Sequence, residues 1–260
     1  MPLTRRTLAH RSLAALAAAS PLLMSQTASA DPTDADTLRL GGQDIHFRLF
    51  ANAAEDVARR PLILYCGGAG FTVARDGLWV AEALMRHADV LMWDYPGQGR
   101  SSGFPDPVTA ERVVRGLAAH VDARYAGRPV VVWGHSLGGF VAAQIARHLG
   151  PGAVVLEATA PEPVEALEAT GVRVPEAFRS LLPLLARYSI PAALEAYDGE
   201  VLVFGAGRDR TLPVRLSREL ARAVDGAAYV ENAGASHYGT LREARTHQAV
   251  AAMLKRMDAT

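Results

Sequence analysis

A Gly-His-Ser-Leu-Gly-Gly segment at residues 134–139 constrains the fold of this chain more than any other feature. It directly follows an apolar run at residues 130–133, typical of a buried strand, and directly precedes a helical pattern. A Gly-x-Ser-x-Gly pattern between a strand and a helix predicts a strained turn with the serine at positive φ. Such a turn lifts the hydroxyl of Ser136 above the sheet edge, where the helix N-terminus stabilises negative charge.

Short apolar runs alternate with helical patterns over most of the chain, which predicts an α/β fold with a mostly parallel, doubly wound sheet. Two alternating runs around a glycine-rich turn predict an antiparallel hairpin at the start, over residues 37–50. Parallel strands covered on both faces are expected at residues 62–66, 90–94, 130–133, 153–157, 201–204 and 227–232. Helices are expected at residues 77–88, 108–125, 137–149, 213–224 and 239–257.

A proline-rich segment interrupts this alternation over residues 158–199. Its prolines stand at positions 161, 163, 175, 183 and 191, and only short helical pieces fit between them. The segment is short for a separate domain. We therefore expect a small helical lid inserted into one domain that spans residues 31–260.

The beginning of the chain has the layout of a bacterial export signal. The pair Arg5-Arg6 precedes an alanine- and leucine-rich run at residues 13–24, and the small residues at 28–30 fit an A-x-A cleavage site. Residues 1–30 are therefore expected to be a signal peptide of the Tat type, with Sec as the alternative route, and the protein to be periplasmic or secreted. A stable membrane anchor is not expected, because the apolar run is shorter than the ~20 residues of a membrane span and contains Pro21.

The composition excludes several other classes of protein. The formal net charge is +0 and charged residues are interspersed, so the sequence indicates no nucleic-acid partner. The single cysteine, Cys66, excludes an intramolecular disulfide. Neither an H-E-x-x-H motif nor clustered Cys and His residues are present, and we expect no metal or other cofactor.

The turn at residues 134–139 is called the elbow below. Its serine needs partners, because a hydroxyl is a poor nucleophile near neutral pH. In this architecture the acid and then the base follow the serine along the chain. The fifth predicted parallel strand leads into a loop that carries Asp209, and the sixth leads into a small-residue loop that ends at His237. We predict Ser136 as nucleophile, His237 as base and Asp209 as acid. Glu157, at the end of its own strand, is the alternative acid, in which case Asp209 is only a helix cap.

Backbone amides must also hold the oxyanion of a tetrahedral intermediate. One is expected from Leu137, directly after the nucleophile. The second is expected from the glycine-rich loop after the first parallel strand, at Gly68 or, as the second choice, Gly67. This loop lacks the G-x-G-x-x-G pattern and the G-K-[ST] ending of phosphate-binding loops. A second glycine-rich loop, at residues 94–103, is expected to be structural, with Asp94 binding local backbone amides.

Three aromatic residues near these positions, Phe71, Phe140 and Tyr238, are candidates to line an acyl pocket or else belong to the core.

His135 lies within the elbow, but its side chain is expected to point away from the position of the base. Cys66 is not expected to be a nucleophile, because no base is placed for it.

With these residues in place, the chain resembles the α/β-hydrolase superfamily from about residue 37 to its C-terminus. The oxyanion loop, the loop at residues 94–103, the elbow, and the acid and base loops occur in the order typical of that superfamily. The short lid and the loop at 94–103 are most similar to the branch of serine aminopeptidase-like and monoacylglycerol lipase-like hydrolases. One departure is Cys66-Gly67, where relatives usually carry His-Gly, and it implies altered support of the oxyanion loop.

The resemblance and the residues together predict an exported serine hydrolase that cleaves carboxylic esters of small or medium acyl groups through an acyl-enzyme. An aminopeptidase would use the same three residues but needs acidic lid residues for the substrate amine, for which Glu162, Glu165 and Glu168 are available. A thioesterase or an acyltransferase would also share the site. A binding protein without activity on the same scaffold is the alternative from a different class.

Overall fold

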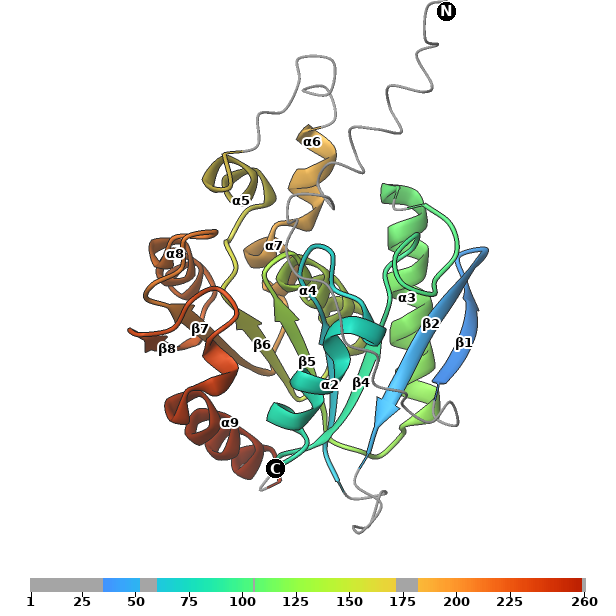
Figure 1. Cartoon of the computed structure of the whole chain (residues 1–260), viewed down its shortest axis with the longest axis horizontal. Helices are drawn as coiled ribbons and strands as arrows, with labels where there is room; N and C mark the ends of the chain where they lie inside the picture. Colours follow the sequence, from blue (N-terminus) through green and yellow to red (C-terminus); the bar gives the residue numbers. More distant parts are fainter. Residues whose placement is uncertain (1–34, 52–59, 105, 172–181, 259–260) are drawn as a thin grey trace, which may run out of the picture.

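The computed structural model describes residues 35–51, 60–104, 106–171 and 182–258 (Figure 1). The predicted signal peptide at residues 1–30 lies outside these ranges, and so does the middle of the predicted lid. Within them, no helix is long and apolar enough to cross a membrane.

The described residues form one eight-stranded sheet with the strand order β1-β2-β4-β3-β5-β6-β7-β8. The strands are β1 (Ala35–Leu40), β2 (Gln43–Phe50), β3 (Leu62–Cys66), β4 (Asp89–Trp93), β5 (Val130–His135), β6 (Ala153–Glu157), β7 (Glu200–Ala206) and β8 (Ala228–Asn232). β1 and β2 pair with each other and with β4 in antiparallel fashion, and all other neighbours are parallel. This confirms the predicted doubly wound sheet with an antiparallel hairpin at its beginning.

Helices cover both faces of the sheet. They are α2 (Val73–Leu84), α3 (Pro107–Arg124), α4 (Leu137–Leu149), α8 (Val214–Ala223) and α9 (Ala244–Met257), with short helices in the lid and a 3-10 turn, η4 (Thr240–Arg242). Alternate residues of each strand point to opposite faces, so the core forms on both sides. On β3, Ile63 and Tyr65 pack with α2 and α9, whereas Leu62 and Leu64 pack with α3 and α4.

Two helices differ from the prediction in their bounds. The helix predicted at residues 77–88 begins earlier, because Thr72 caps it: the hydroxyl of Thr72 accepts the Arg75 amide, and the Thr72 amide donates to Asp76. The helix predicted at 239–257 is divided into η4 and α9, because Glu243 between them has extended backbone.

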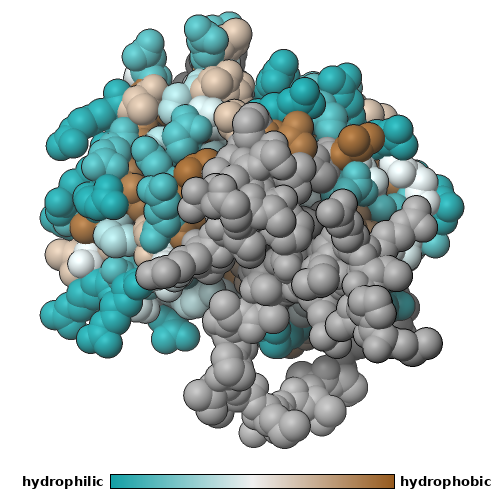
Figure 2. All heavy atoms as spheres, turned by 90° about the horizontal axis from the view of Figure 1, so that it is seen from above, coloured by the Kyte–Doolittle hydropathy of each residue, from teal (hydrophilic) through white to brown (hydrophobic). Residues whose placement is uncertain are grey.

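The described parts of the predicted lid lie between β6 and β7. They are α5 (Pro163–Ala169), α6 (Leu182–Leu185), the 3-10 turn η3 (Ala186–Tyr188) and α7 (Ile190–Leu194). α5 and α6 lie at the top of Figure 1, on the side to which the parallel strands point. Ile190 and Leu194 of α7 are instead buried in the core with residues of α4 and α8. Seen from above, most described side chains of this side are hydrophilic, with hydrophobic groups in small separate patches (Figure 2).

Candidate active site

The elbow holds Ser136 in the strained conformation that the glycine pattern predicts. Ser136 has φ 54° and ψ −121°, and it stands between the end of β5 and the first residue of α4. Its amide donates to the carbonyl of Glu157 at 2.9 Å, which ties the turn to the neighbouring strand. A Cβ on Gly138 would lie 2.0 Å from the carbonyl oxygen of Cys66, so only glycine fits where α4 crosses the end of β3.

His237 and Asp209 lie together although they belong to different loops. His237 Nδ1 and Asp209 Oδ2 are 2.6 Å apart, and their side chains are only 6% and 1% exposed. The other carboxylate oxygen, Oδ1, accepts the amides of Thr211 and Leu212, both at 2.8 Å. Asp209 therefore caps its own loop and at the same time fixes the ring of His237. The helix-cap alternative was wrong, because the N-cap of α8 is Pro213, without a side-chain hydrogen bond, and Asp209 lies in the preceding loop.

The bond to Asp209 leaves the opposite ring nitrogen, Nε2, to act toward substrate. Among the described residues no hydrogen bond joins His237 Nε2 to the hydroxyl of Ser136. Such bonds are often long before a substrate binds and shorten in the reacting complex. The described geometry thus contains a His237 imidazole oriented by Asp209 and a half-buried Ser136 at the elbow, with no hydrogen bond between the two side chains.

The prediction for His135 was wrong. Its ring lies against the ring of His237, with centroids 4.8 Å apart, and its Nε2 hydrogen-bonds the carbonyl of His237 at 2.9 Å. Burial, together with the neighbouring imidazole of His237, lowers the pKa of His135 to about 3. His135 is therefore a neutral donor that holds the backbone of His237. The sequence carried no signal for this contact, because 102 residues separate the two partners.

The carboxyl of Glu157, the alternative acid, binds groups other than His237. Its carboxyl is buried, accepts the indole N–H of Trp133 at 2.8 Å and hydrogen-bonds the hydroxyl of Thr240. Burial raises the pKa of Glu157 to about 8, so the carboxyl is mostly protonated at neutral pH. It forms no hydrogen bond with His237 within the described ranges, and Asp209 is the carboxyl that reaches the imidazole.

The loop after β3 brings Gly68 next to Ser136. A Cβ on Gly68 would lie 3.3 Å from Ser136 Cβ and 3.0 Å from His135 Nδ1. The amide of Leu137 is the first of α4 and therefore has no partner within the helix. Gly67 is held on the other side of the loop, where its carbonyl accepts the hydroxyl of Tyr95 at 2.8 Å.

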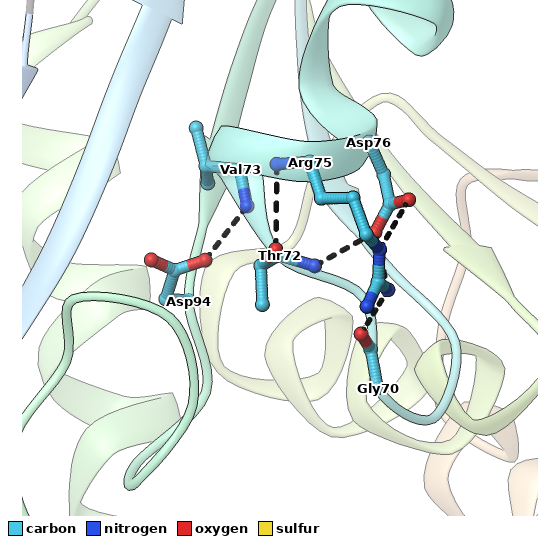
Figure 3. Close-up of polar contacts among 6 residues, drawn as sticks. All are labelled: Gly70, Thr72, Val73, Arg75, Asp76 and Asp94. Carbon is cyan, nitrogen blue, oxygen red and sulfur yellow. Dashed lines mark hydrogen bonds and ion pairs between the residues drawn. The ribbon is translucent and has the colours of Figure 1, made fainter. Parts of the chain in front are cut away.

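The same loop is fixed where it enters α2 (Figure 3). Arg75 donates to the carbonyl of Gly70 and forms an ion pair with Asp76 at 2.8 Å. The first amide of the helix, on Val73, donates to Asp94 Oδ1 at 2.7 Å. As the glycine-rich loop at residues 94–103 predicts, Asp94 is buried and bonds backbone amides, including that of Arg100 at 2.8 Å.

Cys66 stands at the end of β3, where relatives usually have histidine. Its side chain is fully buried, and burial raises the pKa of the thiol to about 12. A protonated, inaccessible thiol is no nucleophile. In this chain the loop is held by the hydroxyl of Tyr95 at Gly67 and by the guanidinium of Arg75 at Gly70, on either side of Gly68.

A cavity of about 310 Å³ lies beside these residues. Its walls come from the end of β3, the oxyanion loop, α2, the elbow and the segment after His237: Tyr65, Gly68, Ala69, Phe71, Arg75, Asp76, Trp79, His135, Tyr238 and Arg242. Phe71 and Tyr238 are thus placed in the wall, as predicted. Phe140 is not: it is buried in the core with residues of β6, α7 and α8. Within the described ranges no three His, Cys, Asp or Glu side chains gather in a way that could hold a metal ion.

The sheet, the elbow and the acid and base loops together define an α/β hydrolase. The family model described as "Alpha/beta hydrolase family" matches residues 63–195, more than half of the chain. The chain belongs to this family. No curated protein matches the chain significantly.

Solved structures share the fold at low sequence identity. Est1E from Butyrivibrio proteoclasticus is similar with a TM-score of 0.70 and 15% identity, covering 88% of this chain and 100% of that one. The esterase Pf2001 of Pyrococcus furiosus has a TM-score of 0.65 and 14% identity, covering 89% and 95%. The enol-lactonase from Burkholderia xenovorans LB400 has a TM-score of 0.59 and 20% identity, covering 86% and 100%.

Proposed function

We propose that this hydrolase is a serine esterase that cleaves carboxylic esters of small or medium acyl groups. The observation that carries the proposal is the buried pair of Asp209 and His237, 2.6 Å apart, in the same site as the strained serine of the elbow. An esterase and an enol-lactonase among the structural relatives support the same chemistry, because a lactone is a cyclic ester.

The reaction divides into two acyl transfers. Ser136 Oγ attacks the acyl carbon while His237 Nε2 takes the hydroxyl proton, and the imidazolium is stabilised by Asp209. The amides of Leu137 and Gly68 hold the oxyanion. The intermediate collapses when His237 gives its proton to the departing alcohol. A water molecule, deprotonated by His237, then attacks the acyl-enzyme, and its collapse returns the proton to Ser136 and releases the acid.

Aminopeptidase activity is the less favoured alternative. It needs a free carboxylate to bind the substrate amine. Glu162 already accepts the hydroxyl of Ser189 at 2.6 Å, and Asp76 in the cavity wall already accepts Arg75 and the Thr72 amide. Glu165 and Glu168, the other two acidic residues expected for this purpose, do not line the cavity. Thioesterase activity differs only in the leaving group and is tested by the thioesters in the assay below. Acyltransferase activity differs only in the acyl acceptor and is tested by adding an alcohol to the same assay and measuring the transfer product.

The test is labelling of the mature protein with a fluorophosphonate probe, which reacts with activated serines. We expect labelling in the wild type and in Ser102→Ala, a control at an exposed serine outside the site, and none in Ser136→Ala. A panel of p-nitrophenyl esters, thioesters and aminoacyl amides then identifies the bond that is cleaved. A folded wild type that is neither labelled nor active on the panel would instead support the binding-protein alternative.

We also propose that residues 1–30 direct export and are removed afterwards. The twin arginine, the apolar run and the small residues at 28–30 support this. Removal at that point would leave the first described strand, which begins at Ala35, intact.

A further inference from the structure

The cavity beside the elbow shares its walls with the reacting groups. Gly68 belongs to the proposed oxyanion loop, His135 precedes Ser136, and Tyr238 follows His237. A substituent of the ester bound at Ser136 therefore has this cavity as its neighbour. At about 310 Å³ the cavity is at the small end of the range of about 300–1,000 Å³ for ligand pockets. One ring with a small substituent suits it better than a long chain.

Aromatic side chains form most of the apolar wall. Tyr65 and Phe71 pack against each other with centroids 5.5 Å apart, and Trp79 and Tyr238 complete the lining. Tyr238 is 56% exposed, which places an aromatic face at the mouth. Flat aromatic groups pack well against such faces.

The charges on the wall do not balance. Asp76 is fully engaged: its two oxygens accept Arg75 at 3.0 and 2.8 Å and the Thr72 amide at 2.9 Å. His135 is neutral because burial lowers its pKa. Arg242, at the end of η4, is exposed, and its guanidinium has no hydrogen bond or ion pair with another described residue. One unmatched positive charge therefore remains at the cavity, and no carboxylate of the wall is available for a substrate amine.

We propose that this cavity binds a carboxylate-bearing aromatic group and that Arg242 pairs with its carboxylate. The preferred substrates are then esters with an anionic aryl group, on either the acyl or the alcohol side. This inference rests on the proposed esterase function and adds to it the class of substrate.

The test compares kcat/KM for two matched pairs of esters. On the alcohol side, 4-carboxyphenyl acetate is compared with 4-carbamoylphenyl acetate. On the acyl side, monomethyl terephthalate is compared with methyl 4-carbamoylbenzoate. Each pair differs by one charge at nearly constant shape. We expect the carboxylate to be preferred by about three- to tenfold in at least one pair, mainly through KM, because an exposed ion pair with a charged hydrogen bond supplies about that much.

Variants assign the preference to Arg242. In Arg242→Gln the kcat/KM of each carboxylate ester should fall to that of its neutral partner, and Arg242→Lys should retain part of the preference. Arg222→Gln, the same change at an exposed arginine of α8 outside the cavity, should behave as the wild type. The preference should also shrink in 0.5 M NaCl, because salt screens exposed charges. Equal rates within both pairs, or an equal loss on all four esters in Arg242→Gln, would overturn the proposal.

A binding measurement separates this inference from the proposed function. If no ester is cleaved and no probe reacts, the esterase proposal fails, and calorimetric titration with benzoate and benzamide still tests the cavity. Tighter binding of benzoate that disappears in Arg242→Gln would support the carboxylate site. Equal or absent binding of both compounds would refute it.

Discussion

The buried carboxyl of Glu157 is expected to make the free energy of unfolding fall as pH rises. Burial raises the pKa of its carboxyl from 4.5 to about 8. In the unfolded chain the group ionises near its ordinary value. Between these two values the folded state keeps a proton that the unfolded state has released, so the free energy of unfolding falls as pH rises. The contribution is complete below about pH 4.5 and is lost by about pH 8.

The magnitude follows from the size of the shift. At about 1.4 kcal/mol per pKa unit, the loss across this window is about 5 kcal/mol. Glu157→Gln removes it, because an amide does not ionise. The amide can still accept the indole N–H of Trp133 and donate to the hydroxyl of Thr240, the two contacts of the native carboxyl. We expect the variant to become more stable relative to the wild type by about 5 kcal/mol between pH 4.5 and pH 8.

The assay is urea unfolding, followed by tryptophan fluorescence, at one-unit steps from pH 5 to pH 8. The wild-type free energy of unfolding is subtracted from that of the variant at each pH. The contributions of groups that titrate in both proteins then cancel. Glu82→Gln, at an exposed position of α2, controls for the loss of a carboxylate as such. A Glu157→Gln difference that stays constant within about 1 kcal/mol across the range would show that Glu157 is ionised in the folded state, and the reasoning would be refuted.

Four further predictions concern the site and the leader. Asp209→Asn should lower kcat on esters by about 10⁴-fold, because His237 loses its orientation, and near-wild-type kcat would contradict the assignment. Gly68→Ala keeps the amide but places a Cβ 3.3 Å from Ser136 Cβ, so it should lower kcat by about 100-fold through displacement of the loop or the serine, and an unchanged kcat would show that this close approach is not needed. Ser136→Gly should be about 1 kcal/mol more stable to urea than Ser136→Ala, because glycine tolerates φ 54°; equal stabilities would show that the turn is unstrained. Intact-mass analysis of exported protein should show Asp31 as its first residue, and retention of residues 1–30 would contradict signal cleavage.

The strands could be predicted from the sequence because their apolar runs end at glycine, proline or charged residues. The predicted bounds of β3 and β6 agree with the structure, and those of the other parallel strands differ by a few residues. The start of α2 was missed because the helix begins in a loop rich in small residues. Its signal, Thr72 followed by Asp76, is present in the sequence but is short.

The candidate catalytic residues could be proposed from motif order alone, since each follows a predicted strand. The cavity could be predicted only in part, through Phe71 and Tyr238. Arg242 and Trp79 lie within predicted helices, and nothing in the sequence marks them as pocket residues. The wall is formed by three stretches that are far apart in the chain, at residues 65–79, 135 and 238–242. Contacts between distant segments, such as His135 with His237, leave no periodic pattern in the sequence.

The way in which the loop after β3 is anchored has a consequence for how activity responds to change. Tyr95 holds it at Gly67, Arg75 at Gly70 and Asp94 at Val73, all before any substrate is present. Under the proposed function, donors aligned in this way need no rearrangement when the carbonyl of a substrate binds, so the entropy of ordering them is lost once, during folding, and not in every turnover. Activity is thereby coupled to groups that never meet the substrate. Loosening Asp94 would slow the chemistry even where the protein stays folded.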